Sequence, residues 1–257
     1  MNSEQIQEKH YNRIALEYEA HYNDACSQEY RIKFQYETVF SGVNLAGKHV
    51  LEAMCGSGHT TQYLLSKGAA VTGLDISPRE IDSFRQQWPD CEAICASALD
   101  SGLENDSFDC VVVSGGLHHV HPHLSRVVRE IHRILKPGGY FCFIEPHAGS
   151  LPDVVRKLWY KHDSLFADNE AAIDVAALKA EFASSFNFNF ETYLGNVGHL
   201  LVLNSMVFRI PLSFKPLYTP LIIKMESVLN KALGASFSCN VVAQWQKIVE
   251  NSNPGKF

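Results

Sequence analysis

The middle of the chain alternates short apolar runs with amphipathic segments, and this alternation limits the folds open to the chain more than any other feature. Five apolar runs of strand length follow one another between Lys48 and Pro146: HVLEAM, AAVTGLDI, CEAICAS, FDCVVVSG and YFCFIEP. Strands that alternate with helices form βαβ units, which produce a parallel sheet covered by helices on both faces. We therefore predict the α/β class, with a doubly wound sheet.

The helices between these runs have recognisable ends. One follows Gly58 and ends at Gly68. Another begins with Ser77 as N-cap, has Pro78 at its first helical position, and has Glu80 in place to complete a capping box. A third has one apolar face and is expected to end before the KPGG turn. Its apolar residues are Leu124, Val127, Val128, Ile131 and Leu135.

The segments on either side of this alternation have a different character. Residues 1–45 are rich in tyrosine and charge, and apolar residues at helical spacing predict helices there. After Pro146, the runs FNFNFETY and SFSCNVVAQW predict two more strands with a long insertion between them. Within the insertion we expect a helix that starts at Thr219 and Pro220 and ends at Gly234. One side of this helix is apolar, with Leu221, Ile222, Met225, Val228, Leu229 and Ala232. We interpret this stripe as a packing surface rather than a membrane anchor, because its polar side lacks the dense Lys and Arg of interfacial helices.

Charge and cysteine content argue against several classes of function. The chain of 257 residues has a net charge of -6 and a sequence pI near 6.0, so it offers no basic surface for nucleic acid. Its seven cysteines are scattered without a CxxC pair, which indicates reduced thiols and a cytoplasmic location. The polar N-terminus is unlike a signal peptide, and polar residues interrupt the most apolar segment, Leu194–Leu212, too often for a membrane span. Peripheral membrane association and the oligomeric state stay open.

The stretch HVLEAMCGSGHTT, from His49 to Thr61, joins the first predicted strand to the first helix. Gly56 and Gly58 have no Cβ, so the backbone of this turn can approach a ligand closely. Asp75 ends the second strand about twenty residues later, where a carboxylate can accept both hydroxyls of a ribose. In a doubly wound sheet, ligands bind in the crevice at the carboxyl ends of the strands. These residues therefore indicate a ribose-bearing ligand.

Four motifs in a fixed order extend this interpretation: VLEAMCGSG, GLDIS, ENDSFDCVVVSGGLHHV and REIHRILKPGGYFCFIEP. Between Lys48 and Pro146, their order and spacing resemble those of the class I S-adenosylmethionine-dependent methyltransferases. The resemblance implies a Rossmann-like sheet of seven strands with helices on both faces and a reversed last hairpin. The two late strands fit that hairpin. The resemblance also implies S-adenosylmethionine as the cofactor.

The family's first motif, acidic-x-Gly-x-Gly-x-Gly, maps onto Glu52, Met54, Gly56 and Gly58. Met54 stands where the family has a glycine. Either this position uses only its backbone, with the thioether at the pocket edge, or the cofactor site is lost. We favour the first interpretation because every other part of the motif set is intact. Ser97 stands where the family often has an acidic residue that binds the adenine amino group, and a hydroxyl accepts that bond more weakly. The cofactor-binding residues implied by the resemblance are Tyr11, Tyr18, Glu52, Ala53, Met54, Gly56, Gly58, Asp75, Ile76, Ser97, Ala98, Leu99, Ser114 and Gly115.

Candidate catalytic residues lie at the ends of the fourth and fifth strands. Glu145 and His147 end the fifth strand, where the family's acceptor meets the methyl donor. His118 and His119 follow the fourth strand, and the family pattern favours a structural role for His119. A histidine suits the deprotonation of a hydroxyl, so we expect His118 or His147 to act as the base, with Glu145 fixing one imidazole tautomer. The run HHVHPH is not assigned to a metal, because metal ligands converge from several directions with supporting carboxylates.

The acceptor is expected to be a small molecule, because residues 114–117 read Ser-Gly-Gly-Leu rather than the Asn/Asp-Pro-Pro-aromatic tetrad of enzymes that methylate base amines. The predicted function is methyl transfer to an oxygen or nitrogen of a natural-product, sugar or lipid-linked intermediate. One alternative is a non-catalytic S-adenosylmethionine-binding module. Another is a nicotinamide-dependent oxidoreductase, although Thr61 occupies the third glycine position of that family's motif.

The resemblance also suggests how the chain is divided. Residues 1–45 are predicted to form a helical cap, in which Tyr11 and Tyr18 match an N-terminal Y-x-x-x-A-x-x-Y pattern that closes over the cofactor in many small-molecule methyltransferases. Residues 46–257 form the predicted methyltransferase domain. Within it, residues 195–234 are expected to form a helical cap over the substrate.

Overall fold

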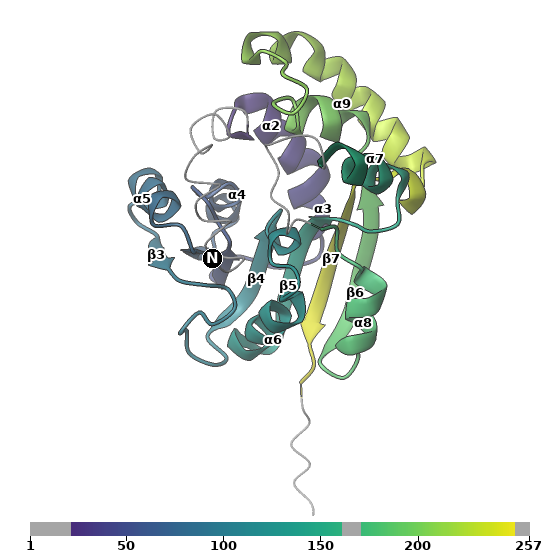
Figure 1. The fold of residues 1–257 in the computed structure, drawn as a ribbon. Helices are drawn as coiled ribbons and strands as arrows, with labels where there is room; N and C mark the ends of the chain where they lie inside the picture. The colour runs from purple at the N-terminus through teal and green to yellow at the C-terminus, as the bar shows by residue number, and fades with distance from the viewer. Residues whose placement is uncertain (1–21, 161–170, 250–257) are drawn as a thin grey trace, which may run out of the picture.

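The computed structural model describes residues 22–160 and 171–249, and seven strands within them form one sheet in the order β3-β2-β1-β4-β5-β7-β6 (Figure 1). Strands β1 to β5 pair in parallel, whereas β7 runs antiparallel to both β5 and β6. The doubly wound sheet with a reversed last hairpin confirms the fold predicted from the sequence. The strands are β1 (His49–Ala53), β2 (Ala70–Asp75), β3 (Glu92–Cys95), β4 (Phe108–Ser114), β5 (Leu135–Pro146), β6 (Phe186–Leu194) and β7 (Asn240–Lys247).

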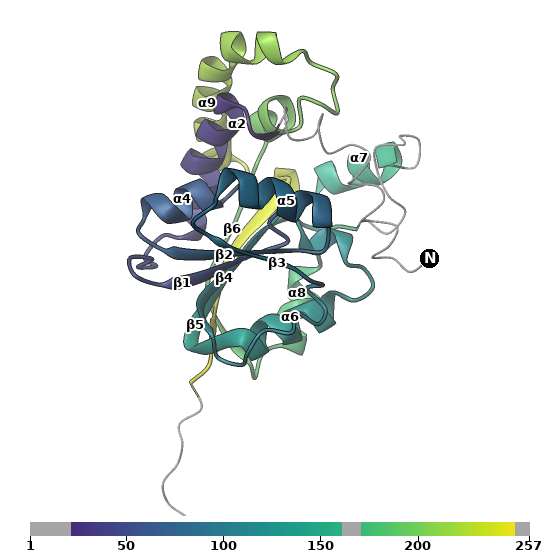
Figure 2. The ribbon, with the colours of Figure 1, turned by 90° about the vertical axis from the view of Figure 1, so that its left-hand side faces the viewer.

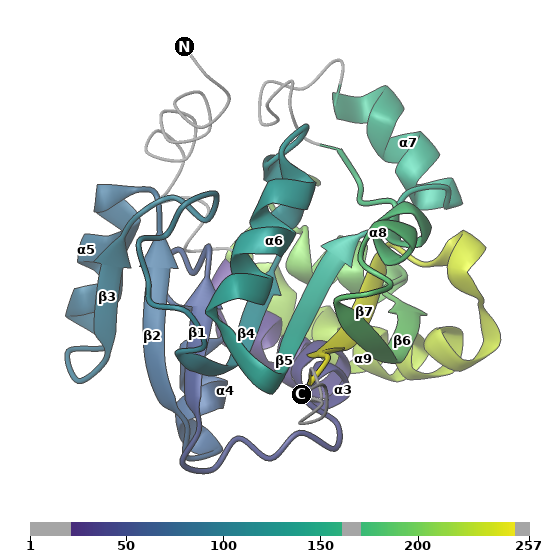
Figure 3. The same ribbon diagram turned by 90° about the horizontal axis from the view of Figure 1, so that it is seen from below.

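Helices cover both faces of this sheet. They are α3 (Glu37–Val39), α4 (Thr61–Ser66), α5 (Pro78–Gln87), α6 (Leu124–Ile134) and α8 (Val175–Glu181). Helix α7 (Leu151–Tyr160) lies beyond the edge of the sheet (Figure 1), and a short 3-10 turn, η2 (Leu117–His119), follows β4. Val111 and Val113 of β4 join the core under α6 and α8, whereas Cys110 and Val112 join the core under α3 and α4. Figure 3 shows these two pairs of helices on opposite sides of the sheet. The central strands are therefore buried on both faces, as parallel strands of this class are.

Two boundaries differ from the prediction. Helix α6 ends at Ile134, because Leu135 already has extended geometry and pairs with Phe108 at the start of β4. The KPGG sequence therefore lies inside β5 rather than in a turn before it. Strand β7 begins at Asn240 instead of Ser236, because Ala235–Phe237 form a single 3-10 turn, η5.

The described part of the N-terminal segment is helical, as predicted. α2 (Ala25–Tyr30), the π-helix η1 (Arg31–Tyr36) and α3 form one continuous run. Asp24 caps this run, since its carboxylate accepts hydrogen bonds from the backbone N–H groups of Cys26 at 3.0 Å and Ser27 at 3.3 Å. Tyr30 and Phe34, whose spacing indicated a helix, are both buried. The remainder of the predicted cap, residues 1–21, lies outside the described residues.

The insertion between β6 and β7 is helical and is anchored to α2 by polar contacts. It contains η3 (His199–Leu203), η4 (Leu212–Phe214) and α9 (Lys215–Ala232). The Lys215 Nζ lies 2.5 Å from the Asp24 carboxylate and 2.8 Å from the Ser27 hydroxyl. The Glu226 carboxylate accepts hydrogen bonds from the Tyr30 hydroxyl at 2.6 Å and from the Asn196 N–H at 2.7 Å. These buried contacts fix the insertion against the N-terminal helices.

The predictions for α9 itself were wrong in two respects. The helix starts at Lys215 rather than Thr219, because Pro216 occupies the first-turn position that had been assigned to Pro220. The predicted packing stripe is wrong for Leu221, Met225 and Val228, which are exposed, whereas Ile222 is buried in a cluster with Tyr30 and Phe34. Within the described residues, no helix combines the length and hydrophobicity needed to cross a bilayer.

Candidate active site

The site lies where the strand order changes direction. From β1, the strands β2 and β3 extend to one side and β4 and β5 to the other, so the loops that follow β1 and β4 diverge at the carboxyl edge of the sheet. Such a switch point is where doubly wound folds bind their ligands. Figures 1 and 2 show α2, α7 and α9 beyond this same edge.

The loop after β1 has a backbone that only small residues favour. Gly56 and Gly58 have φ angles of 52° and 94°. A Cβ on Gly58 would clash with the Trp88 indole and would lie 3.0 Å from Phe84, so α5 packs directly on this loop. A Cβ on Gly56 would meet nothing closer than Glu80 at 3.5 Å. The Gly58 side of the loop is thus packed, while the Gly56 backbone is accessible.

Met54 has a φ angle of 56°, which is the left-handed region that glycine favours. Its side chain reaches toward the loop after β4, where a Cβ on Gly116 would lie 2.5 Å from the Met54 Sδ and 2.9 Å from Val113. Gly116 therefore leaves the room that the thioether occupies. This arrangement supports the interpretation in which Met54 uses its backbone as a glycine would and places its side chain at the pocket edge.

Glu52 is buried below the same loop. Its carboxylate accepts a hydrogen bond from the Thr60 N–H at 2.8 Å and another from the Thr61 hydroxyl at 2.5 Å. Burial raises the pKa of Glu52 from 4.5 to about 7, against the opposing effect of these two hydrogen bonds. The carboxylate thus holds the loop and the start of α4, and it would act on a cofactor through the loop it shapes.

Asp75 ends β2 and faces the glycine loop. Its two carboxylate oxygens accept hydrogen bonds from the Gly56 N–H and the Ser77 N–H, both at 2.9 Å. Burial raises the pKa of Asp75, and these backbone bonds oppose the rise. Since each carboxylate oxygen can accept two hydrogen bonds, Asp75 retains the capacity for two ribose hydroxyls. The half-buried Ile76 follows it directly.

The segments that follow β3 and β4 form the far side of the predicted cofactor site. The Ser97 hydroxyl accepts a hydrogen bond from the Leu99 N–H at 3.0 Å, and Ala98 and Leu99 pack against the main core. Ser114 ends β4 and is followed by Gly115, whose φ is 74° and beside which a Cβ would meet nothing within 4 Å. Gly115 thus has open space beside its backbone, whereas a Cβ on Gly56 would only reach ordinary contact distance of Glu80 and His59. Both loops therefore leave room beside a glycine, and this cradle fits a ligand that bridges them.

Glu145, at the end of β5, is fully buried and binds the loop after β4. Its carboxylate accepts hydrogen bonds from the N–H groups of Gly116 at 2.7 Å and Leu117 at 2.8 Å, and it contacts the His118 Nδ1 at 2.8 Å. Burial raises the pKa of Glu145 from 4.5 to about 7, while the backbone hydrogen bonds lower it. The structure thus brings together the carboxylate and one of the two histidines predicted to pair with it.

His147 is held by a different set of residues. Its Nε2 lies 2.9 Å from the Ser238 carbonyl, to which it donates, and its ring packs edge-on against Tyr193. Its backbone N–H donates to the Cys239 carbonyl at 3.4 Å. His147 therefore ties the end of β5 to the β6 and β7 hairpin.

Known proteins share this combination of motifs and fold. A family model described as a methyltransferase domain matches residues 51–143. The chain is 36% identical over 105 residues to the uncharacterized methyltransferase sll0829 of Synechocystis sp., a match that covers 40% of this chain and 50% of that protein. It is also 36% identical over 114 residues to the phthiotriol/phenolphthiotriol dimycocerosates methyltransferase of Mycobacterium leprae, over 43% of this chain and 42% of that protein. Residues 51–143 thus match a methyltransferase domain, in agreement with the resemblance of the sequence motifs to the class I S-adenosylmethionine-dependent methyltransferases.

A solved structure extends the likeness in fold to nearly the whole chain. The N-methyltransferase NodS from Bradyrhizobium japonicum, in complex with S-adenosylhomocysteine, superposes with a TM-score of 0.58 over 96% of this chain and 99% of that chain. The sequence identity is 14%, so this likeness concerns the fold alone. The match to each of the two curated relatives spans half of that protein's length or less.

Sequence reasoning missed the contacts between the N-terminal segment and the glycine loop. The Asn23 side chain contacts the His59 Nδ1 at 2.5 Å and donates to the Ser57 hydroxyl at 3.3 Å. The Tyr36 hydroxyl donates to the His59 carbonyl at 3.0 Å, and burial lowers the pKa of His59 to about 3. No local sequence pattern predicts such contacts, because they join residues more than twenty positions apart. Tyr11 and Tyr18 lie outside the described residues, so their predicted cofactor contacts stay predictions.

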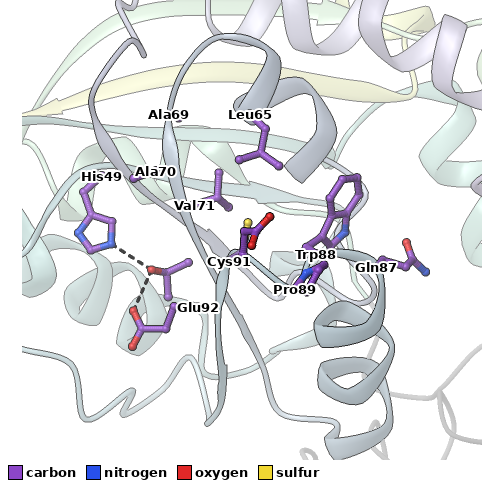
Figure 4. Close-up of a pocket in the computed structure, with 12 residues that line it drawn as sticks. His49, Leu65, Ala69, Ala70, Val71, Gln87, Trp88, Pro89, Cys91 and Glu92 are labelled. Atoms are coloured by element: carbon purple, nitrogen blue, oxygen red, sulfur yellow. Dashed lines mark hydrogen bonds between the residues drawn. The ribbon is translucent and has the colours of Figure 1, made fainter.

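A pocket of about 500 Å³ lies at the opposite edge of the sheet (Figure 4). His49, Ala70 and Glu92, the first residues of β1, β2 and β3, all line it. It is thus at the amino ends of the strands, away from the candidate active site. Within the described residues, no three His, Cys, Asp or Glu side chains are grouped closely enough to hold a metal ion.

Proposed function

We propose that this protein transfers a methyl group from S-adenosylmethionine to an oxygen or nitrogen of a small-molecule acceptor. One observation carries the proposal: Glu145, at the end of β5, contacts His118, on the loop that follows β4, beside the predicted cofactor loops. A base held at that position stands where an acceptor would meet the methyl donor.

The predicted cofactor residues would hold S-adenosylmethionine along the switch point. Asp75 would accept the ribose hydroxyls, while the accessible backbone at Gly56 and Gly115 would border the amino acid part. Ser97 and Leu99 would line the adenine. When bound, the cofactor supplies a sulfonium-activated methyl group, so the protein's main task is to align the acceptor.

His118 is the residue we assign as the base. Its Nδ1 is engaged by Glu145, so it would take the acceptor's proton at Nε2. The Glu145 carboxylate fixes this tautomer, and its bonds to the Gly116 and Leu117 N–H groups hold the ring's loop in place. We do not extend the assignment to His147, because its Nε2 is bonded to the Ser238 carbonyl.

We further propose that the N-terminal residues 1–45 and the insertion 195–234 cover the acceptor. In support, α2 and α9 are joined by buried contacts of Lys215 and Glu226 at the carboxyl edge of the sheet. The relative from Mycobacterium leprae is named for phthiotriol and phenolphthiotriol dimycocerosates, and the apolar insertion of this chain suits an acceptor with an apolar part. A lipid-linked acceptor therefore joins natural-product and sugar intermediates as a proposed class.

The test is a screen of acceptor pools with methyl-labelled S-adenosylmethionine, followed by kinetics with the acceptor found. An enzyme should accumulate S-adenosylhomocysteine with the right acceptor, whereas a non-catalytic binding module should not. His118→Ala should then lower turnover by about a hundredfold or more without weakening cofactor binding. His123→Ala, which changes an exposed histidine of the same run, is the matched control. Equal turnover of the His118→Ala and native proteins would remove the base and leave alignment as the source of catalysis.

A further inference from the structure

Helix α9 is apolar on both its buried and its exposed side. Its buried side carries Ile222 and Ile223, which pack in a cluster with Tyr30 and Phe34. It also carries Lys215 and Glu226, which bond to the N-terminal helices. Its exposed side carries Leu217, Leu221, Met225 and Val228, spaced four, four and three residues apart, so that they form one stripe. Leu217 is 77% exposed and Val228 is 65% exposed. An apolar stripe of this size facing water is unusual in a helix that is otherwise firmly anchored.

Exposed hydrophobic residues are concentrated in the insertion that contains this helix. Eight of the fifteen exposed large hydrophobic side chains in the described residues lie within 200–237. Four others lie on helix α7, which Figure 2 shows well apart from α9. We call the exposed side of α9 the apolar face.

The charges on the apolar face have one sign. Lys224 and Lys231 are its exposed charged residues, while the acidic residue of the helix, Glu226, is buried and bonded inward. The whole chain, by contrast, has a net charge of -6. The acidic character of the protein is therefore absent from the exposed side of this helix.

We propose that the apolar face docks peripherally on a bilayer that contains anionic lipid. Apolar side chains would enter the interface between headgroups and acyl chains, and the lysines would contact the anionic headgroups. A second copy of this chain is a poorer occupant, because a two-fold interface uses the same patch twice and would bring Lys224 and Lys231 toward their own copies. The docked protein would turn the carboxyl edge of its sheet toward the membrane. That last consequence for acceptor access rests on the proposed function, whereas the docking itself does not.

The experiment measures vesicle binding of the full chain without cofactor or acceptor, so that its result is independent of methyl transfer. Vesicles of phosphatidylglycerol and phosphatidylcholine are compared with vesicles of phosphatidylcholine alone in a sedimentation assay. The native chain should bind the anionic vesicles more strongly, and added salt should weaken that binding. The triple variant Leu217→Gln, Leu221→Gln, Met225→Gln should bind about tenfold or more weakly, since glutamine keeps helix propensity but removes the apolar contact. The pair Lys224→Glu and Lys231→Glu should weaken binding to the anionic vesicles by a similar factor.

The matched control is the variant Ile32→Gln, Leu65→Gln, which changes exposed hydrophobic residues elsewhere and should bind like the native chain. Circular dichroism of each variant verifies that the fold is retained. Absence of native binding to the anionic vesicles would overturn the proposal, as would equal binding by the triple variant. A native dimer in light scattering that the triple variant converts to a monomer would also overturn it, because the apolar face would then be a contact between copies of the chain.

Discussion

Glu52 shows how a single buried carboxyl can set the response of the glycine loop to pH. Burial raises its pKa in the folded protein from 4.5 to about 7. The folded state therefore binds this proton more tightly than the unfolded state between those two values. The associated stability is fully present below the unfolded pKa and is lost as the pH rises through the folded pKa. The same sign applies to Glu145, whose pKa is also raised to about 7.

We predict that Glu52→Gln flattens the loss of stability between pH 5 and pH 8. A glutamine keeps an acceptor for the Thr60 N–H but carries no charge, so the pH-dependent part of the free energy of unfolding should shrink by on the order of 1–3 kcal/mol. Urea denaturation at several pH values measures it. Glu104→Gln, at an exposed carboxyl, is the control. An unchanged pH slope in the Glu52→Gln variant would show that this carboxyl is charged and tolerated in the folded protein.

At the scale of residues, the sequence predicts where candidate site residues lie better than it predicts which contacts their side chains make. Asp75 and Glu145 lie at the strand ends where the motifs indicated them, because parallel strands bring their carboxyl ends to one edge. His147 could not be separated from His118 beforehand, since its hydrogen bond to Ser238 joins residues 91 positions apart. The side-chain partner of Met54 could not be predicted from the sequence either.

The two loops at the switch point are matched elements. Met54 fills space that Gly116 leaves, at the cost of a left-handed backbone in a residue other than glycine. Because the loops after β1 and β4 contact each other through this pair, a substitution in one loop should alter the packing of the other. The departure at Met54 is thus a change in packing between two loops.

We predict that Gly116→Ala destabilises the fold by about 1–3 kcal/mol, because the new methyl group overlaps Met54. In a Met54→Gly background the same change should cost less, with a coupling of about 0.5 kcal/mol or more, and the contact with Val113 should keep the rescue incomplete. Denaturant unfolding of the native protein, the two single variants and the double variant completes the double-mutant cycle. Gly234→Ala serves as control, since a Cβ there meets nothing within 4 Å and its φ is -89°. Additive costs would show that the two loops do not meet as described.

Element boundaries and faces were predicted unevenly. The strands of the central alternation were found to within a few residues, apart from the early start of β5, because burial on both faces gives them continuous apolar runs. Helix α9 was assigned the wrong start, and only part of its predicted packing stripe is buried. Hydrophobic spacing identifies a stripe but does not say which residues face inward, and here Ile222 is buried while Leu221 and Met225 are exposed.

For the whole molecule, the sheet order followed from the resemblance of four motifs, whereas the arrangement around it did not. The contact between Lys215 and Asp24 joins positions 191 residues apart and brings the insertion to the N-terminal helices. Long-range polar contacts of this kind leave no periodic signal in the sequence. They nonetheless place α2, α7 and α9 beyond the edge at which the cofactor loops lie (Figure 2).

The central claim is that S-adenosylmethionine binds at the carboxyl ends of β1, β2 and β4, and titration calorimetry with S-adenosylhomocysteine tests it most directly. The native chain should bind at one site, and Asp75→Ala should weaken the affinity by about tenfold or more through loss of the charged bonds to the ribose. Asp82→Ala, at an exposed carboxylate of α5, should bind like the native chain. No binding by the native chain, or equal affinity in a folded Asp75→Ala variant, would contradict this account.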